Sequence, residues 1–449
     1  MRVLFLEVDT ERSWAVASIG PAFIASYLRA HGHEVAFHRA TLEASDDEVA
    51  AAVAAIAPDL LGLSLTTRQW QRGRLLVRAI RARFEVPVVA GGLHPTFSPE
   101  EVLAEPGFDH VCLGEGEEPM LDLIQALERG DQLGGALSKP IANIWSAGGR
   151  RPALRDPIEP LDALPFMARD LLDEHKGVVH MTTQRGCPFP CTYCAARMYN
   201  QLYEGTAEYG RRRSHQSVLD ELFGLRDAGL LAYVIFLDDT FTIHHPWVRE
   251  FCRVYGAELR VPFSLHARVE TVNEKLLHQL AEAGCQQITY GVESGSERVR
   301  REIMKRQVTN QRFRDVFRWT REAGIAVTAN YMLGLPGETR QDMYQTLALA
   351  RELDVLDFGY FVFYPYPGTQ LFELCRDRGY LPDDYLDLPA NHRQSILRLP
   401  ELGQADIGEV YDGFTALRRQ RYGDRYGAAL AAELLGEATD HVDALARTG

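Results

Sequence analysis

Three of the seven cysteines in this 449-residue chain lie within the short segment CPFPCTYC, at positions 187 to 194. Cys187, Cys191 and Cys194 form a C-x-x-x-C-x-x-C pattern, a spacing typical of metal ligation. A structural zinc site commonly has four Cys or His ligands, and no regularly spaced fourth ligand accompanies this trio. Three thiolates can instead bind three irons of a [4Fe-4S] cluster, leaving the fourth iron open to a non-protein ligand.

The other cysteines are scattered through apolar or helical patterns, and we interpret them as small buried residues. They are Cys112, Cys252, Cys285 and Cys375.

The composition is that of a soluble globular protein, with 46% hydrophobic and 24% charged residues. The formal net charge of -14 argues against a nucleic-acid partner, because phosphate binding requires clustered basic residues and Arg211 to Arg213 form the one tight basic run. We see neither a secretory signal nor an apolar run of about 18 residues, so we expect a cytoplasmic protein without a membrane partner. In that reducing compartment cysteines stay unpaired.

Short apolar runs alternate with amphipathic helical patterns through residues 1–138, which predicts a doubly wound α/β domain of the Rossmann type. The expected strands are residues 2–8, 34–40, 60–65, 86–92 and 110–116. Ligands of such sheets bind beyond the carboxyl ends of the strands, where Gly91, Gly92, Gly114 and Gly116 occur. These glycines either let a ligand approach the backbone closely or serve ordinary turns.

Residues 139–175 have the Pro, Gly and charge content of a linker. A second series of strands is expected at residues 178–184, 233–239, 263–269, 287–293, 327–333 and 358–364. About six βα units predict a partial TIM barrel over residues 176–372, with its active site at the carboxyl ends of the strands. Residues 373–449 look helical, and we expect them to cover one end of the barrel.

The cysteine motif, with Tyr193 directly before its third cysteine, resembles the signature of the radical S-adenosylmethionine (SAM) superfamily. The resemblance implies that SAM chelates the open iron and that an electron from the cluster cleaves it to methionine and a 5'-deoxyadenosyl radical. It also implies an external electron donor, such as a flavodoxin, a ferredoxin or a dedicated reductase.

Further segments resemble the SAM-binding motifs of this family in the order of the barrel strands: LDDTF (237–241), GVESG (291–295) and MLGLPGET (332–339). The resemblance assigns them to the methionyl amino group, the ribose hydroxyls and the adenine, respectively. Arg268 could pair with the SAM carboxylate, and a structural salt bridge is an equal alternative. The resulting candidate SAM contacts are Tyr193, Asp238, Arg268, Glu293, Ser294, Gly334, Leu335 and Pro336.

The first domain resembles the cobalamin (B12)-binding domain of one branch of this superfamily, on the segments GGLHPTFSPEEVL and GEGEEPMLDLI. It lacks the D-x-H-x-x-G pattern that supplies an axial histidine, since the corresponding region, residues 9–20, reads DTERSWAVASIG. A cobalamin-loaded domain and an empty one both stay open.

Two reactions on a hydroxylated small-molecule substrate follow from the resemblance. The missing histidine and the compact C-terminal end favour radical dehydration of a diol in an amino sugar without cobalamin, as in the diol dehydratases of aminoglycoside antibiotic biosynthesis. The alternative is cobalamin-dependent C-methylation. Asp239, His266 and Tyr364 are the candidate acids and bases near the strand ends, although each also fits packing or SAM binding. A non-catalytic cobalamin or redox sensor is a third hypothesis, which the ordered SAM-binding motifs argue against.

Overall fold

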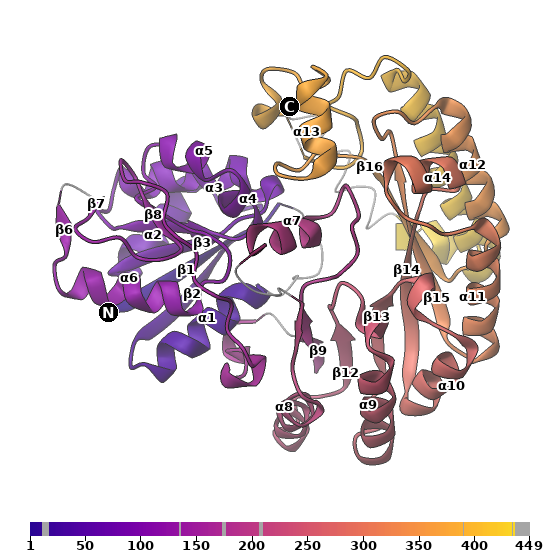
Figure 1. Cartoon of the computed structure of the whole chain (residues 1–449), viewed down its shortest axis with the longest axis horizontal. Helices are drawn as coiled ribbons and strands as arrows, with labels where there is room; N and C mark the ends of the chain where they lie inside the picture. The colour runs from indigo at the N-terminus through magenta and orange to yellow at the C-terminus, as the bar shows by residue number, and fades with distance from the viewer. Residues whose placement is uncertain are drawn as a thin grey trace. The chain divides into compact units, whose positions relative to one another are not determined.

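The computed structural model describes residues 1–10, 18–133, 136–172, 177–205, 210–388, 390–432 and 434–435. The chain divides into two compact units, each of which we describe by itself (Figure 1). The first unit comprises Met1–His175, Ala195–Ser214 and Tyr366–Thr369, and the second comprises Lys176–Cys194, His215–Pro365 and Gln370–Gly449.

The first unit contains a six-stranded sheet in the order β2-β1-β3-β4-β5-β8. Its strands are β1 (Arg2–Val8), β2 (Glu34–Ala40), β3 (Leu60–Ser64), β4 (Val88–Gly91), β5 (His110–Cys112) and β8 (Ile144–Ser146). The first five are parallel, which confirms the doubly wound α/β prediction, whereas β8 pairs antiparallel with β5. The expected linker is therefore partly structural, because β8 covers the edge of this sheet.

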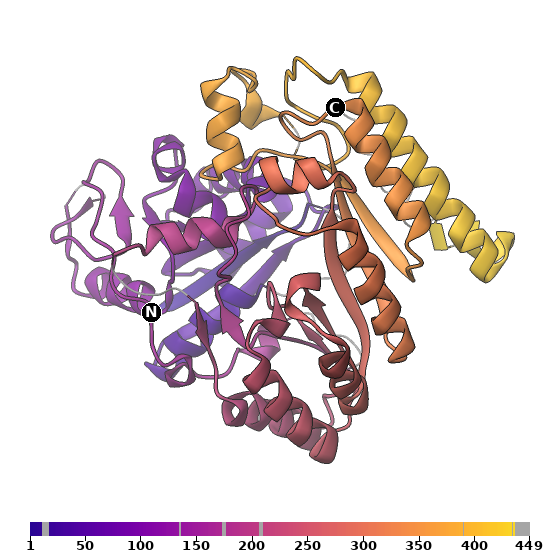
Figure 2. The same cartoon turned by 45° about the vertical axis from the view of Figure 1, so that its right-hand side comes forward.

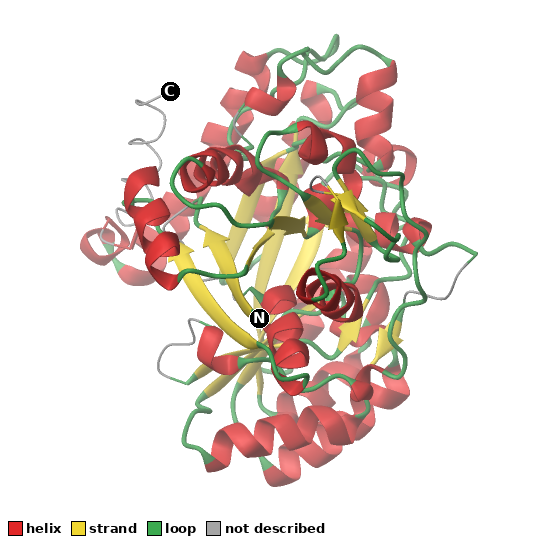
Figure 3. Ribbon diagram, turned by 90° about the vertical axis from the view of Figure 1, so that its left-hand side faces the viewer, coloured by secondary structure: helices red, strands yellow, loops and turns green. Residues whose placement is uncertain are grey.

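Helices pack on both faces of this sheet (Figure 3). The helices of the unit are α1 (Ile19–Ala30), α2 (Asp46–Ile56), α3 (Thr67–Arg81), α4 (Leu93–Phe97), α5 (Pro99–Ala104), α6 (Glu117–Glu128) and α7 (Ala195–Leu202). One core contains residues of α2 and α3, among them Val53 and Trp70, and the other contains residues of α1 and α6, among them Leu28 and Leu123. The smaller strands are β6 (Gln132–Leu133), β7 (Ala136–Leu137) and β11 (Arg211–Arg212).

The second unit contains six parallel strands in the order β16-β15-β14-β13-β12-β9, which confirms the partial barrel. The strands are β9 (Val178–Met181), β12 (Tyr233–Phe236), β13 (Phe263–Ala267), β14 (Cys285–Glu293), β15 (Ala326–Leu333) and β16 (Asp357–Val362), with the short β10 (Gln184–Arg185) following β9. Alternate residues of β15 are buried, as expected for a sheet with one face against helices. The less buried face of the sheet is therefore available to line a binding site.

Helices line the outer face of the strands in the second unit (Figure 2). They are α8 (His215–Asp227), α9 (His245–Glu258), α10 (Glu274–Ala283), α11 (Asn310–Glu322) and α12 (Arg340–Glu352). The unit also contains α13 (Gln370–Asp377) and α14 (Gln404–Tyr426). The leucine stripe and terminal glycine of NEKLLHQLAEAG predict a helix over residues 273–284, which α10 confirms. Asn273 caps it by accepting from Leu276 N at 2.9 Å, and Gly284 ends it with a left-handed φ of 108°.

The long helix α14 was expected to cover an end of the barrel, but it packs against α12 and the edge strand β16. Phe414 of α14 contacts the rings of Tyr331, Phe358 and Tyr360, with centroid distances of 5.3, 6.0 and 5.4 Å. The edge of the sheet is thereby covered by an apolar helix face, which protects it from pairing with another strand.

No helix in the described part of the chain combines the length and apolarity needed to cross a bilayer.

Candidate active site

The loop that carries the three cysteines is anchored at both ends within the second unit. At its start, Asp238 Oδ1 accepts hydrogen bonds from the backbone N–H groups of Thr183 and Gln184, at 2.9 and 2.8 Å. These bonds end strand β9 at Met181, three residues earlier than the sequence predicted, because the side chain replaces a neighbouring strand as acceptor. Asp238 thus holds the loop, and this oxygen is already engaged by protein donors.

The other anchor is Thr192, which lies between the second and third cysteines. Its Oγ1 donates to the carbonyl oxygen of Ile303 at 2.7 Å, and its N–H donates to the carbonyl oxygen of Met304 at 3.4 Å. Both acceptors lie at the end of a π-helical turn, Val299–Ile303. Such turns leave carbonyl groups available for other partners and are frequent at functional sites.

The three cysteine side chains form no disulfide with any described residue, and two of them have polar neighbours at measured distances. Arg268 Nη1 lies 3.0 Å from Cys191 Sγ, and Thr240 Oγ1 lies 3.9 Å from Cys187 Sγ. In the described ranges, no group of three or more His, Cys, Asp or Glu side chains is arranged to hold a single metal ion. An iron–sulfur cluster makes a different demand, because each of the three thiolates binds its own iron.

Tyr193 and Glu293, two predicted SAM contacts from distant segments, meet in the structure. The Tyr193 phenol hydrogen-bonds to the Glu293 carboxylate. Strand β14 bulges between Gly291 and Glu293, and Glu293 has a left-handed φ of 67°. A Cβ atom at Gly291 would lie 2.3 Å from Glu293 Oε1, so this glycine makes room for the carboxylate. The first residue of the GVE segment is therefore a glycine because any side chain there would collide with the carboxylate of Glu293.

Burial and nearby charges shift the pKa values of Glu293 and Tyr193. Burial raises the pKa of Glu293, an effect that Arg306, Arg268 and Tyr193 partly offset. Burial and the nearby Glu293 carboxylate also raise the pKa of Tyr193, so its phenol stays a donor. Glu270 has the opposite balance: burial would raise the pKa of its carboxyl, but Arg306 and Arg268 hold it below the usual range.

The predicted adenine-contact segment is held by a carboxyl group that the sequence analysis did not select. Glu338 Oε2 accepts the N–H groups of Gly334 and Leu335, at 2.7 and 3.0 Å. Gly334 has a left-handed φ of 76°, which a side chain would strain, and Leu335 and Pro336 are buried. Complete burial raises the pKa of Glu338 to about 8, despite the two backbone donors. Glu338 therefore fixes the shape of this turn.

The remaining predicted residues have mixed environments. Ser294 is buried and its hydroxyl pairs with Thr346 Oγ1 at 3.2 Å, so it contributes to packing against α12. Tyr364 is also buried, with its ring 6.4 Å from that of His392. Asp239 and His266 are exposed to solvent; partial desolvation by neighbouring protein atoms raises the pKa of Asp239 and lowers the pKa of His266. They are the two acid–base candidates that a small molecule can reach.

In the first unit, the glycines at the carboxyl ends of the strands are explained by protein packing. A Cβ atom at Gly92 would lie 2.9 Å from the backbone N of Leu65, and one at Gly114 would lie 2.2 Å from the Tyr203 hydroxyl. His94 at this edge is buried, stacks on Trp70 and lies 3.3 Å from Thr67 Oγ1. It is therefore engaged within its own domain. Residues 11–17, in the segment that lacks the axial histidine, lie outside the described residues.

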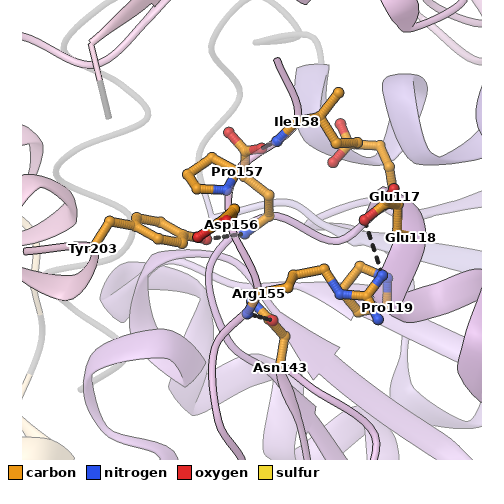
Figure 4. A pocket seen from close by; sticks show the side chains of 10 residues that line it. Glu117, Glu118, Pro119, Asn143, Arg155, Asp156, Pro157, Ile158 and Tyr203 are labelled. Atoms are coloured by element: carbon orange, nitrogen blue, oxygen red, sulfur yellow. Dashed lines mark hydrogen bonds and ion pairs between the residues drawn. The ribbon is translucent and has the colours of Figure 1, made fainter. Parts of the chain in front are cut away.

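A small pocket lies in the first unit, at the loop between β5 and α6 (Figure 4). Glu115 in this loop forms a buried ion pair with Arg211, and its Oε2 accepts from Ile158 N at 3.3 Å. Its backbone N–H donates to the Tyr203 hydroxyl at 3.0 Å. Arg211, from the basic run, is therefore an internal structural residue rather than part of an exposed patch. These contacts are all made within the protein, and the pocket carries no ligand assignment.

Two family models match the chain, in the order that the two units suggest. The model for the radical SAM superfamily matches residues 181–350, and the model for the B12 binding domain matches residues 14–124. The uncharacterized methyltransferase PH0819 of Pyrococcus horikoshii is 31% identical over 395 residues, which cover 83% of each chain. The chain belongs to the radical SAM superfamily. A [4Fe-4S] cluster and SAM are the cofactors of this superfamily, and the B12-binding domain adds cobalamin as a candidate.

Two further relatives have more specific names. The anaerobic magnesium-protoporphyrin IX monomethyl ester cyclase of Rubrivivax gelatinosus is 27% identical over 84% of this chain and 70% of its own length. The cytidylyl-2-hydroxyethylphosphonate methyltransferase of Streptomyces wedmorensis is 25% identical over 86% and 82%. The relatives named as methyltransferases and cyclases do not support the expected dehydration without cobalamin; they favour the methyltransferase alternative.

Solved structures of radical SAM enzymes show the same fold. The methyltransferase TsrM of Kitasatospora setae, with tryptophan and a SAM analogue bound, superposes with a TM-score of 0.67 at 18% identity, over 84% of this chain and 76% of its own. The cobalamin-dependent enzyme OxsB, with aqua-cobalamin bound, gives a TM-score of 0.64 at 18% identity, over 86% and 56%.

The residues of the second unit fit a cluster and SAM. Three thiols lie in one anchored loop, beside the Arg268 guanidinium, whose buried Nε has no hydrogen-bond partner among the described residues. An anionic group such as the SAM carboxylate would satisfy that donor. Sequence reasoning did not select Glu270, Arg306 or Glu338. Glu338 lies within a quoted motif and Glu270 two residues beyond Arg268, but no sequence signal pointed to Arg306.

Proposed function

We propose that this protein is a cobalamin-dependent radical SAM methyltransferase acting on a small molecule. The observation that carries the proposal is the likeness to a relative named a methyltransferase over 83% of both chains, combined with the match of residues 14–124 to a B12 binding domain. Cobalamin held by the first unit would supply a cobalt centre that can carry a methyl group, and a cluster held by the cysteine loop would supply the electron, received from an external donor, that cleaves SAM to a radical.

In this proposal, Cys187, Cys191 and Cys194 each bind one iron through a thiolate. Glu293, oriented by Tyr193, accepts hydrogen bonds from the ribose hydroxyls, since its two oxygens can serve a vicinal diol. The Nε of Arg268 donates to the SAM carboxylate. The backbone turn that Glu338 holds lies against the adenine. Asp239 and His266 are the side chains available to hold or accept a proton of the substrate.

The carboxyl edge of the sheet in the first unit would hold cobalamin. His94 is engaged by Thr67 and Trp70, so we propose that this histidine is not an axial ligand. The match to the B12 binding domain supports cobalamin here, and the absence of a histidine from DTERSWAVASIG is compatible with binding in which no such ligand is supplied.

The test is anaerobic reconstitution of the full chain with iron, sulfide and hydroxocobalamin, followed by quantification of retained cobalamin. The protein is then reduced and incubated with SAM, and S-adenosylhomocysteine, the product of methyl donation, is measured with and without cobalamin. We expect retained cobalamin near one equivalent per chain and S-adenosylhomocysteine that depends on it. Failure to retain cobalamin, with release of 5'-deoxyadenosine alone, would refute methyl transfer.

Release of 5'-deoxyadenosine alone would favour a radical cyclase, a candidate supported by the 27% identical relative from Rubrivivax gelatinosus. Such an enzyme would release 5'-deoxyadenosine without S-adenosylhomocysteine.

A further inference from the structure

A chain of charged side chains leads from one proposed cluster ligand into the core of the second unit. Arg268 donates through Nη1 to Cys191 Sγ at 3.0 Å and through Nη2 to Glu270 Oε1. The second oxygen of Glu270 accepts from Arg306 Nη2 at 3.2 Å. One carboxylate is thus shared by two guanidinium groups, and one of these contacts the sulfur.

Arg306 is the fixed end of this chain. Its side chain is 1% exposed, and its Nη1 donates to the carbonyl oxygen of Gly291 at 2.8 Å. Its backbone N–H donates to the carbonyl oxygen of Arg300 at 2.7 Å. Because the guanidinium is buried and bonded to backbone, it can hold Glu270 in one orientation.

Arg268 is held from a third direction by an aromatic ring of the cysteine loop. Its Cζ lies 3.9 Å from the centroid of the Phe189 ring, between Cys187 and Cys191 in the sequence. A guanidinium fixed by a carboxylate and a ring face cannot follow the sulfur freely. Its N–H is therefore directed at Cys191 before any ligand arrives.

We propose that Glu270 and Arg306 are positioning residues that hold Arg268 as an N–H···S donor to Cys191, and that this donor raises the reduction potential of the cluster. The inference rests on the proposed binding of a cluster by the three cysteines. A cationic donor at a ligating sulfur stabilises the reduced cluster, because reduction adds negative charge there. The arrangement makes the cluster easier to reduce by the external donor.

The test is a redox titration of the reconstituted full chain, monitored by electron paramagnetic resonance without SAM. Glu270→Asp keeps the charge but shortens the side chain, so that it cannot bridge both arginines. Arg268→Lys keeps the charge but loses the fork that contacts sulfur and carboxylate together. We expect both variants to have a lower midpoint potential than the wild type, at equal iron content per chain.

Glu352→Asp is the matched control, because Glu352 pairs with both Arg314 Nε and Nη2 on the surface of the same unit. Its potential should equal that of the wild type. A purely structural network would lower the melting temperature of Glu270→Asp without moving the potential, and unchanged potentials in Glu270→Asp and Arg268→Lys would overturn the inference. If Glu270→Asp fails to hold the cluster, the midpoint potential of Arg268→Lys relative to the wild type decides instead. A wild type without a cluster signal would instead refute the proposed function.

Discussion

The hydroxyl of Tyr193 hydrogen-bonds to the carboxylate of Glu293, joining the residue before the third cysteine to the last residue of strand β14. The bond orients a partly buried carboxylate at the carboxyl ends of the barrel strands, beside the cysteine loop. The position suits a carboxylate that binds the ribose of SAM while the cluster binds its methionyl end.

We therefore predict that Glu293→Gln weakens SAM binding. The amide keeps one acceptor but loses the charge, and hydrogen bonds to charged groups are worth about 1.5 to 3 kcal/mol, so the KM for SAM should rise about 10- to 100-fold. Tyr193→Phe removes only the orienting bond and should raise the KM by a smaller factor. Tyr290→Phe is the control, because its hydroxyl pairs with Thr320 at 3.0 Å on the opposite face of β14. An unchanged KM in Glu293→Gln would remove the ribose assignment.

Glu338 should make stability depend on pH. Its folded pKa of about 8 exceeds its ordinary value of 4.5, so the native state binds a proton that the unfolded state releases. The contribution of Glu338 to the free energy of unfolding is fully present below pH 4.5. It falls as pH rises towards 8, by about 1.4 kcal/mol per pH unit at most.

The measurement is the difference in melting temperature between wild type and Glu338→Gln across that pH range. The amide introduced by this substitution is expected to keep accepting both backbone N–H groups but not to titrate, so the difference should shift in favour of the variant as pH rises. A difference that stays constant with pH would contradict the raised pKa.

The buried ion pair of Glu115 and Arg211 should be important for the stability of the first unit. Glu115→Gln leaves the Arg211 guanidinium buried without its counter-charge, which typically costs about 3 to 5 kcal/mol. Glu250→Gln removes the partner of Arg253 from an exposed pair and should change stability little. Chemical denaturation followed by circular dichroism compares the two variants. Equal losses of unfolding free energy in the two variants would show that burial does not make the Glu115–Arg211 pair more important for stability than the exposed pair.

Gly114 and Gly130 form a matched pair of left-handed glycines, with φ values of 73° and 70°. Alanine at Gly130 meets no atom within 4 Å, so Gly130→Ala should cost only the backbone strain, about 1 to 2 kcal/mol. Alanine at Gly114 would also displace the Tyr203 hydroxyl from the backbone N–H of Glu115. We expect Gly114→Ala to lower the unfolding midpoint clearly further than Gly130→Ala. Identical midpoints would argue against this packing.

The architecture could be predicted from sequence because periodicity and glycine or asparagine caps are local signals. The leucine stripe of α10, formed by Leu276, Leu277 and Leu280, and the terminal Gly284 are examples. Strand ends were harder: β9 stops at Met181 because the side chain of Asp238, 57 residues later, takes over as acceptor. The route of α14 along β16 likewise depends on aromatic contacts between distant segments.

The candidate site was predictable where residue types recur in short motifs. Tyr193 and Glu293 were each selected in this way, from two separate motifs, whereas their mutual contact depends on the fold. Arg306 could not be found in this way, because its role arises from burial next to Glu270 and Gly291, which only the fold brings together. The reaction was harder still: a missing histidine favoured dehydration, whereas relatives over most of the chain favour methyl transfer.

The most direct test of the radical SAM site is the release of 5'-deoxyadenosine from SAM by the anaerobically reconstituted, reduced protein. Wild type should release it, whereas Cys191→Ala should release none and lose most of its iron. Cys252→Ala, at a buried thiol of helix α9, should retain both iron and activity. Release of 5'-deoxyadenosine by Cys191→Ala at the wild-type rate, or its absence from the wild type with a reducible cluster present, would contradict a SAM-cleaving cluster held by these three cysteines.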